Sequence, residues 1–469
     1  MNPRVVLFAS LIEFASVFEV RGTVFVPAKK GVTNNWEIFQ TRVLADVPAV
    51  ATNNVDAGLS KFGGLQARRV SASGYFYRTN LAGRWWLVDP EGCLYVQRGV
   101  SDVAISHGAN SQRVLREKFG SESNWAAGAT TLLRSQGFTG LGAWSDVDHL
   151  RQVQQPLVYT RILNLMGGYG QQRGGTYQQS GHLGYPNDCI FVFDPGFEEY
   201  CDNQARQLAA FKNDPWLLGY FSDNELPLRR GVLKNFLSLP KSDPGHQAAA
   251  KWWQTRRGAN AAEITEQDEK DFLAVVVDRY FRIVSTAIKK YDPNHLFLGS
   301  RFNGRVLDQP EVFRAAGPYL DVVSANYYWA WTPSKEKLAM WERESGRPVM
   351  ITEWYAKAED SGMGNMGGAG WIVKTQRDRG AFYQNFTLGL LECKSCVGWD
   401  WFKYADNDPT NIKADPSNRD ANKGLVNIKY EPYQPLLEAM KPLNERTYSL
   451  IDYFDRVAVK LSDKQGAHL

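Results

Sequence analysis

Short apolar runs alternate with stretches of helical periodicity along most of the 469-residue chain. The apolar runs are bounded by Gly, Pro, Asn and Asp, as buried strands often are, and the stretches between them repeat apolar residues at helical spacing. Strands are expected within residues 94–105, 138–144, 157–165, 217–228, 296–302, 320–328, 348–355 and 397–404. Helices are expected at residues 124–135, 196–213, 266–291, 334–345, 375–392 and 432–444, with short ones near 149 and 310. Eight strands alternating with helices predict an α/β fold, a closed parallel (β/α)8 TIM barrel.

The chain before the barrel has a different pattern. Residues 22–27, 36–44 and 74–79 are short β-like runs without helical periodicity. Residues 83–100 (GRWWLVDPEGCLYVQRGV) hold two apolar runs around a DPEG turn, which predicts a hairpin. The expected domains are a small β-rich N-terminal extension at residues 1–85, the barrel at residues 86–455 and a C-terminal tail at residues 456–469.

Three connecting segments are rich in glycine or polar residues. Residues 167–187 are expected to form a long Gly/Gln-rich loop, and residues 238–260 a polar insertion. Residues 362–370 (GMGNMGGAG) lack the Lys-Ser/Thr pair of a phosphate-binding loop. A mobile loop beside a pocket is therefore the preferred interpretation of this third segment.

Two of the expected strands end in glutamate. The run LLGYFSDNELPL (217–228) contains Glu225 shortly before Pro227, which blocks further sheet pairing, and PVMITEWY (348–355) contains Glu353. The C-terminal strand ends of such a barrel form one active site, so both carboxylates are expected in a shared pocket. Such a pair can hydrolyse a glycosidic bond, with retention at a separation of about 5 to 5.5 Å and inversion at about 6.5 to 9.5 Å. The alternative is that each glutamate is a surface or ion-paired residue.

Neighbouring side chains separate the roles of the two glutamates. Asn224 offers an amide beside Glu225, suited to a sugar hydroxyl next to the reacting carbon. Asn326 and Tyr328 share one face of their strand because side chains alternate with period two. Tyr328 is therefore expected to donate to Glu353 and to hold it ionised as a nucleophile, whereas Glu225 needs a raised pKa to act as an acid.

The chain is rich in aromatic residues, with 15 Trp, 21 Tyr and 24 Phe. Flat apolar faces with polar edges suit sugar rings, although a large aromatic core gives the same composition. Trp401 is the tryptophan that we expect to bind substrate. It is one of six at or just past expected strand ends: Trp144, Trp329, Trp331, Trp354, Trp399 and Trp401.

Two cationic candidates complete the expected substrate-binding set. Arg301 follows a strand and is expected to bind sugar hydroxyls or a nearby carboxylate, with a structural ion pair as the alternative. His182, in the expected loop 167–187, is expected to contact substrate.

Charge and composition exclude several classes of function. The 54 basic and 50 acidic residues are interspersed, so neither nucleic acid nor an anionic membrane is an expected partner. No stretch is long and apolar enough for a membrane span. Residues 5–18 (VVLFASLIEFASVF) follow Arg4 and resemble a degenerate export signal, interrupted by Glu13.

No cofactor or metal is expected. The five cysteines are scattered apart from Cys393 and Cys396, and a zinc site would need a second pair of ligands nearby. The acidic cluster at residues 406–408, with Asp415 and Asp420 downstream, departs from the EF-hand pattern. A solvated loop is the preferred interpretation, and a calcium site is the alternative.

Longer strings carry a family resemblance from about residue 60 to 455. They are RWWLVDPEG (84–92), GYFSDNELPL (219–228), AGWIVKTQRDRGAFYQNFTLGLLE (369–392), GWDWFKYADNDPTN (398–411) and NKGLVNIKYEPY (422–433). With Asn224-Glu225 after strand four and Glu353 after strand seven, the chain resembles the exo-acting β-agarases within clan A of the glycoside hydrolases. The resemblance implies that Glu225 is the acid/base and Glu353 the nucleophile of a retaining enzyme. It also implies cleavage of a β-1,4-linked galactan such as agarose to neoagaro-disaccharides, and favours a secreted or periplasmic location.

Several alternatives remain at this stage. Fewer than ninety residues precede the expected barrel, so short agaro-oligosaccharides are candidate substrates beside the polymer. The same chemistry on another marine galactan is a second reading, and a carbohydrate-binding protein without catalysis is a third. Exo or endo action and the oligomeric state stay open.

Overall fold

The computed structural model describes residues 23–47, 50, 55–257 and 263–466. The possible export signal at residues 5–18 lies outside the described residues. The core is a sheet of parallel strands that follow one another around a barrel. The strands are β7 (Gln97–Ser101), β8 (Gly140–Leu141), β9 (Val158–Ile162), β12 (Leu217–Phe221), β13 (Leu296–Phe297), β14 (Phe302–Asn303), β15 (Val323–Asn326), β16 (Val349–Glu353) and β19 (Cys396–Phe402).

The barrel closes through a strand that is split in two. β13 pairs with β12, whereas β14, from the same run of residues, pairs with β15 on the other side. Between them the backbone bends at Gly299 (φ 84°) and Arg301 (φ 54°). β19 pairs with β7, so eight strand positions form a continuous ring. This confirms the predicted (β/α)8 barrel.

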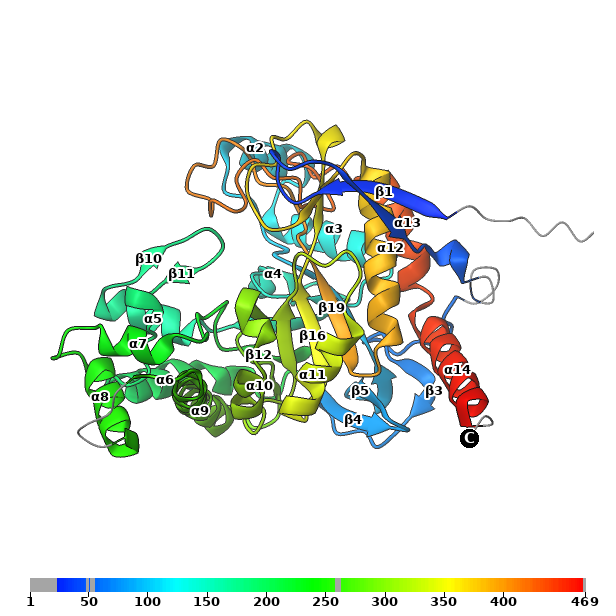
Figure 1. Cartoon of the computed structure of the whole chain (residues 1–469). Coiled ribbons are helices and arrows are strands. Elements are labelled where there is room, and N and C mark those ends of the chain that lie inside the picture. The colour runs from blue at the N-terminus through cyan, green and yellow to red at the C-terminus, as the bar shows by residue number, and fades with distance from the viewer. Residues whose placement is uncertain (1–22, 48–49, 51–54, 258–262, 467–469) are drawn as a thin grey trace, which may run out of the picture.

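Helices surround the barrel in the expected order (Figure 1). The long helix α9 (Glu266–Tyr291) has the bounds that periodicity predicts, because the Thr265 hydroxyl accepts from the Asp268 amide in a capping box. Thr375 caps α12 in the same way. The other helices that fit expected positions are α3 (Glu122–Ser135), α4 (Val147–Leu150), α6 (Phe197–Ala205), α10 (Pro310–Ala316), α11 (Lys335–Ser345), α12 (Gln376–Glu392) and α13 (Gln434–Asn444).

The prediction of an irregular loop at 167–187 was wrong, and two other segments contain helices that the sequence did not predict. The loop expected at 167–187 contains most of α5 (Leu165–Arg173) and a small hairpin of β10 (Tyr177–Gln178) and β11 (Leu183–Gly184). The insertion at 238–260 contains α8 (Pro244–Arg257), which buries only Gly245 and Ala249 and therefore shows little apolar periodicity. The expected boundary of a C-terminal tail falls inside a helix. Helices that the sequence did not predict are α2 (Ala109–Lys118), α5, α7 (Val232–Leu237), α8 and α14 (Thr447–Gly466).

The expected β-rich extension divides between two sheets at opposite ends of the barrel (Figure 1). The lower sheet has the order β3-β6-β5-β4 and packs Phe62, Phe76 and Leu87 against the barrel interior. The predicted hairpin is its β5–β6 pair, and the run 94–105 is divided between β6 and β7. The strands of the lower sheet are β3 (Leu65–Arg69), β4 (Tyr77–Leu81), β5 (Arg84–Val88) and β6 (Cys93–Tyr95).

The upper sheet joins the N-terminal strands to segments from the second half of the chain. β1 (Val24–Lys29) pairs with β2 (Glu37–Thr41) and with β18 (Trp371–Val373), which in turn pairs with β17 (Ala356–Ala358). The Phe39 ring lies 4.9 Å from the ring of Trp331 and 5.0 Å from that of Trp371. The upper sheet is thus fixed to the barrel by aromatic packing.

The described helices include none with the length and apolar character needed to cross a membrane. All five cysteines are free thiols and buried.

Gly219 gives a test of barrel closure. A Cβ at this position in β12 would lie 2.2 Å from the Leu296 carbonyl oxygen, which belongs to the backbone of the split strand. We expect Gly219→Ala to lower the free energy of unfolding by about 1 to 3 kcal/mol, measured by urea denaturation. Gly31→Ala is the control, because its Cβ would meet only the end of the flexible Asn34 side chain. Equal stability of the two variants would contradict this account.

Candidate active site

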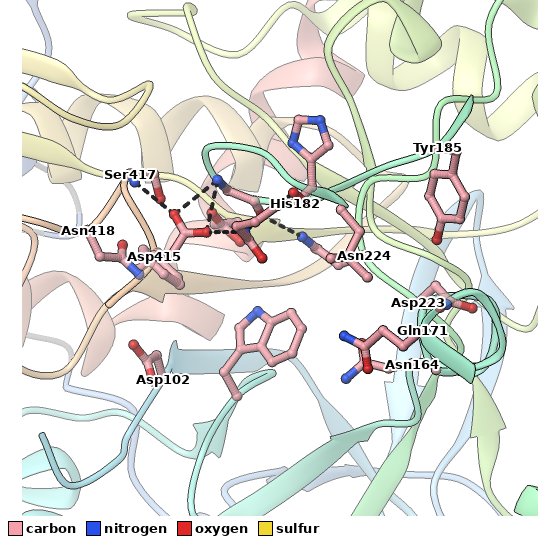
Figure 2. Close-up of a pocket in the computed structure, with 18 residues that line it drawn as sticks. Asp102, Asn164, Gln171, His182, Tyr185, Asp223, Asn224, Asp415, Ser417 and Asn418 are labelled. Carbon is pink, nitrogen blue, oxygen red and sulfur yellow. Dashed lines mark hydrogen bonds between the residues drawn. The ribbon is translucent and has the colours of Figure 1, made fainter. Parts of the chain in front are cut away.

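A cavity of about 460 Å³ opens at the C-terminal ends of the barrel strands (Figure 2). Its size suits a small sugar rather than a polymer segment lying flat. The walls come from residues at or after the ends of β7, β8, β9, β12, β16 and β19. They include Asp102, Trp144, Asn164, Gly181, His182, Asp223, Asn224, Glu353, Phe402, Asp415, Ser417 and Asn418.

Glu225 and Glu353 meet beside this cavity through one amide group. Asn326 Nδ2 lies 2.7 Å from Glu225 Oε1 and 3.3 Å from Glu353 Oε2. These two carboxylate oxygens can be no farther apart than the sum of the two distances. That sum is below the roughly 6.5 Å at which the spacing of inverting glycosidases begins.

Asn326 can face both carboxylates because its other end is fixed. The buried Thr352 hydroxyl donates to Asn326 Oδ1 at 3.0 Å, which directs the Asn326 amino group toward the two acids. The same amino group lies 3.2 Å from Asn224 Oδ1. Asn224 therefore lines the cavity beside Glu225, with its Oδ1 accepting from Asn326 and its Nδ2 donating to the Gly181 carbonyl at 3.3 Å.

Glu225 lies beyond the strand that delivers it. β12 ends at Phe221, and Glu225 follows on a turn with φ 55°, where its amide donates to the Ser300 carbonyl at 3.1 Å. The residue is only 8% exposed. His182 Nδ1 approaches Glu225 Oε2 at 3.5 Å, and hydrogen bonding to Glu225 raises the pKa of His182 despite its partial burial.

Glu353 is held by two strong donors. Arg301 Nη2 lies 2.6 Å from Glu353 Oε2, and the Tyr328 hydroxyl donates to Oε1 at 2.5 Å. Arg301 is fully buried and also donates to the Thr352 carbonyl at 3.1 Å, so it binds the carboxylate rather than reaching solvent. Arg301 was expected to bind either sugar hydroxyls or a nearby carboxylate, and the structure shows the contact with a carboxylate.

Burial raises the pKa of Glu353, and the nearby Glu225 adds to this rise. Arg301, the Tyr328 hydroxyl and Lys423 act in the opposite direction without cancelling the burial effect. Tyr328 makes the predicted contact and, as expected, lowers the pKa of Glu353, although the net shift of that pKa is upward. These donors lower the pKa of Glu353, but burial raises it by more.

Trp401 does not reach the cavity, so this sequence prediction was wrong. Its side chain is fully buried, its ring centroid lies 5.1 Å from that of Trp354, and its indole donates to the Lys423 carbonyl at 3.2 Å. Alternation along β19 turns Trp401 and Trp399 toward α12, whereas Asp400 faces the barrel interior.

Another tryptophan of the predicted set lines the cavity instead. Trp144 is 38% exposed, has φ 68°, and its ring lies 5.8 Å from the Arg301 guanidinium carbon. The sequence feature that indicates this role for Trp144 is its position three residues after the end of β8. Trp331, Trp354 and Trp399 are buried core residues, whereas Trp329 is 47% exposed.

A contact between two loops lies next to His182 in the sequence. Asp415 accepts from the Gly181 amide at 3.0 Å, from Gln178 Nε2 at 2.8 Å and from the Ser417 amide at 2.7 Å (Figure 2). It thus joins the β10–β11 hairpin, which follows β9, to the loop that follows β19. Asp415, Asp102, Asn164 and Asn418 could not be assigned to the site from the sequence, because only the fold brings these loop residues together.

The acidic loop after β19 uses its carboxylates on the protein itself. Asp406 Oδ1 accepts from the amides of Lys423 at 2.8 Å and Gly424 at 2.7 Å, and Asp408 accepts from the Asn110 amide at 2.8 Å. Within the described ranges, no group of three or more His, Cys, Asp or Glu side chains is arranged to hold a metal ion.

The glycine-rich segment 362–370 lies behind the wall of the site. The buried Lys357 ammonium donates to the carbonyls of Asn365 at 3.1 Å, Gly367 at 2.7 Å and Gly368 at 3.2 Å. The 460 Å³ cavity takes no lining from residues 362–370. The expectation of a mobile pocket loop was therefore wrong, because three bonds from one lysine hold the segment against the protein.

The raised pKa of Glu353 predicts a pH-dependent effect on stability. Its ionised form is destabilised by folding, so the penalty is absent well below the ordinary pKa of 4.5 and is fully present once the pH exceeds the folded-state pKa. We expect Glu353→Gln to be more stable than the unchanged protein at pH 7, with the difference vanishing as the pH falls below 4.5. Urea denaturation at several pH values measures this.

Glu392→Gln is the contrasting variant. Burial raises the pKa of Glu392, but Arg42 and Lys335 lower it by more, so its net pKa lies below the ordinary value. This substitution should reduce stability at pH 7. If both variants lost stability at pH 7, the proposed environment of Glu353 would be incorrect.

Comparisons with known proteins place this geometry in a wider context. No protein-family model matches the chain. Beta-agarase B of Vibrio sp. (strain JT0107) is 26% identical over 528 residues, which cover 90% of this chain and 53% of that protein. The chain spans about half the length of the curated relatives that it matches.

Solved structures give more extensive matches. The crystal structure of BpGH50 is 30% identical with a TM-score of 0.80, covering 92% of this chain and 96% of that one. The agarase AgWH50C is 25% identical with a TM-score of 0.70, covering 87% of this chain and 68% of that one. The first of these matches extends over nearly the full length of both chains.

Proposed function

The chain belongs to the β-agarase family of glycoside hydrolases, GH50, and on this premise we propose that it hydrolyses β-1,4-galactosidic bonds in agarose or agaro-oligosaccharides. The observation that carries the proposal is the meeting of Glu225 and Glu353 at the Asn326 amide, beside a sugar-sized cavity. Relatives described as agarases support the choice of substrate.

The proposed mechanism is retaining and has two steps. Glu353 attacks the anomeric carbon while Glu225 gives its proton to the leaving oxygen, so one C–O bond forms as the glycosidic bond breaks. Water then attacks the glycosyl-enzyme, Glu225 takes a proton from it, and Glu353 is released. The short Glu225 to Glu353 spacing supports attack by Glu353 itself, because inverting enzymes need more room for the water.

The surroundings of each acid support this division of roles. Arg301 and Tyr328 both donate to Glu353, which favours the carboxylate form that a nucleophile needs. His182 lies beside Glu225 and is more easily protonated than an ordinary histidine, so it stabilises the carboxylate left after proton transfer. Asn224 is proposed to bond the sugar hydroxyl next to the reacting carbon.

Exo action is supported by the contact between the β10–β11 hairpin and the loop after β19. Asp415, a wall residue of the cavity, joins these two segments through the Gly181 and Gln178 bonds. A linear polysaccharide enters a bridged cavity of this size most readily by its end, and the expected product is neoagarobiose. A polymeric substrate of this kind favours secretion or a periplasmic location.

Product analysis tests the proposed function. Agarose, porphyran and other galactan oligomers are incubated with the protein, and the products are identified by mass. Release of neoagarobiose from agarose oligomers is expected, with the β-anomer formed first by NMR because two inversions restore the configuration. Cleavage of another galactan alone would assign a different substrate, the α-anomer would exclude retention, and binding without cleavage would indicate a protein without catalysis.

Variants of the two glutamates test their roles. Glu225→Gln should lower kcat on agaro-oligosaccharides by roughly 10²- to 10⁴-fold, because the leaving oxygen is no longer protonated. A fluoride leaving group, which needs no strong acid, should restore most of the first step. Glu198→Gln, an exposed glutamate on α6, is the control.

Azide separates the two roles further. Azide needs no general base, so with Glu225→Ala it should capture the glycosyl-enzyme and give a β-glycosyl azide. With Glu353→Ala and a glycosyl fluoride it should attack directly and give the α-azide. The opposite pairing of products would exchange the two assignments.

Tyr328→Phe tests the hydrogen bond to Glu353. The Tyr328 hydroxyl lowers the pKa of Glu353, so its loss raises that pKa further and the acidic limb of the pH–rate profile should move to higher pH. Below the optimum we expect a loss of roughly tenfold or more in kcat/KM, the scale of a hydrogen bond to a charged group. Tyr327→Phe is the matched control, since Tyr327 faces outward against Trp341. An unmoved limb in Tyr328→Phe would contradict the role of this bond.

A further inference from the structure

Six strand ends of the barrel carry a non-glycine residue in the left-handed backbone region. Such a conformation is unfavourable for bulky side chains and gathers at functional sites when the surrounding fold enforces it. The residues follow β7, β8, β9, β12, β13 and β15 in order, and are Asp102 (φ 51°), Trp144 (φ 68°), Asn164 (φ 52°), Glu225 (φ 55°), Arg301 (φ 54°) and Trp329 (φ 65°).

Five of these six residues already belong to the site. Asp102, Trp144 and Asn164 line the cavity, Glu225 is one of the paired acids, and Arg301 binds the other. Trp329 is the sixth, and it has no role in the proposed mechanism.

Trp329 lies just after the end of β15 with its ring open to solvent. It directly follows Tyr328, whose hydroxyl bonds Glu353. Its 47% exposure is high for a tryptophan, a residue that normally buries most of its surface. The Lys30 ammonium, at the end of β1, lies 5.9 Å from the ring centroid and leaves much of the indole uncovered.

The layout of the cavity indicates which part of a substrate would meet this ring. The cavity walls follow the strands from β16 through β19, β7, β8 and β9 to β12. In the described chain, the remaining arc of the barrel, β13 with β14 and then β15, contributes no wall residue. Glu353 and Glu225 lie where the two arcs join. The glycosidic bond of a sugar held in the cavity therefore passes the two acids, and the next sugar lies over the β13–β15 arc.

We propose that Trp329 is a stacking platform for a galactose ring on the leaving-group side of the cleaved bond. This inference rests on the proposed galactan hydrolase function. The C–H face of galactose packs on an exposed indole, and the loss of that contact removes roughly 50 Å² or more of buried apolar surface, enough for about a tenfold change in affinity. The strained backbone at Trp329 is then the means by which the strand end presents its ring to the substrate.

The test compares substrates that differ only on the leaving-group side. In neoagarotetraose a sugar ring leaves, whereas in β-neoagarobiosyl fluoride the leaving group is a single atom. Trp329→Ala should lower kcat/KM on neoagarotetraose about tenfold or more, mainly through KM, and should leave the fluoride reaction within about twofold of the unchanged enzyme. Trp329→Phe keeps a flat ring and should recover most of the loss.

Two further variants guard against an effect of folding. Phe25→Ala removes an aromatic side chain that is 60% exposed on β1, and it should change neither substrate. Trp329→Gly relieves the left-handed backbone, so it should keep the unfolding midpoint of the unchanged protein while losing activity on neoagarotetraose as Trp329→Ala does.

The outcomes separate the two proposals. If the unchanged enzyme is active and Trp329→Ala loses activity on both substrates equally, or on neither, the platform proposal is overturned. The hydrolase function is then unaffected. An unchanged protein that cleaves neither substrate would overturn the hydrolase function, and the platform would fall with it.

Discussion

The site depends on keeping two carboxylates close together inside a protein. Like charges at short range in a poorly hydrated setting repel strongly, so a folded chain must surround them with donors or leave one of them neutral. The amide of Asn326 lies between Glu225 and Glu353, and Thr352 fixes its orientation from below. Arg301 places a full positive charge in direct contact with Glu353. These donors lie on or next to the neighbouring strands β14, β15 and β16, and closure of the barrel at the split strand brings Glu225, which follows β12, to the same point.

The split strand explains how Arg301 reaches this position. An unbroken β-strand would continue its alternation and leave residue 301 fixed in the pleat of the sheet. The bend at Gly299 and Arg301 separates β13 from β14, so the guanidinium enters the barrel interior beneath Glu353. The cost in sheet hydrogen bonding is local, because each half still pairs with its own neighbour.

Much of the architecture follows from the sequence pattern, and the failures have physical causes. The helix at 266–291 was predicted because it has both a capping box and a continuous apolar stripe. The helix α5 was missed because its glycines give no periodicity and its start is fixed by distant Asp223, which accepts from the Met166 and Gly167 amides. Helical propensity within the segment could not reveal that contact.

The site residues also divide into those that the sequence pattern predicts and those that it does not. Glu225, Glu353, Asn326 and Tyr328 could be predicted to lie together because strand ends of a parallel barrel share one rim. The choice of Trp401 failed because the register of β19 decides which of its residues face the helices, and one residue of shift reverses every side chain. Asp415 was missed as a wall residue because it acts through a contact with a hairpin more than two hundred residues earlier.

The upper sheet has a consequence for the integrity of the fold. β1 covers one edge of β18, while Phe39 covers the indoles of Trp331 and Trp371. Proteolytic loss of residues 24–41 would leave an open strand edge next to uncovered aromatic rings, which is a surface prone to self-association. The beginning of the described chain therefore protects the barrel rim from intermolecular strand pairing, in addition to adding stability.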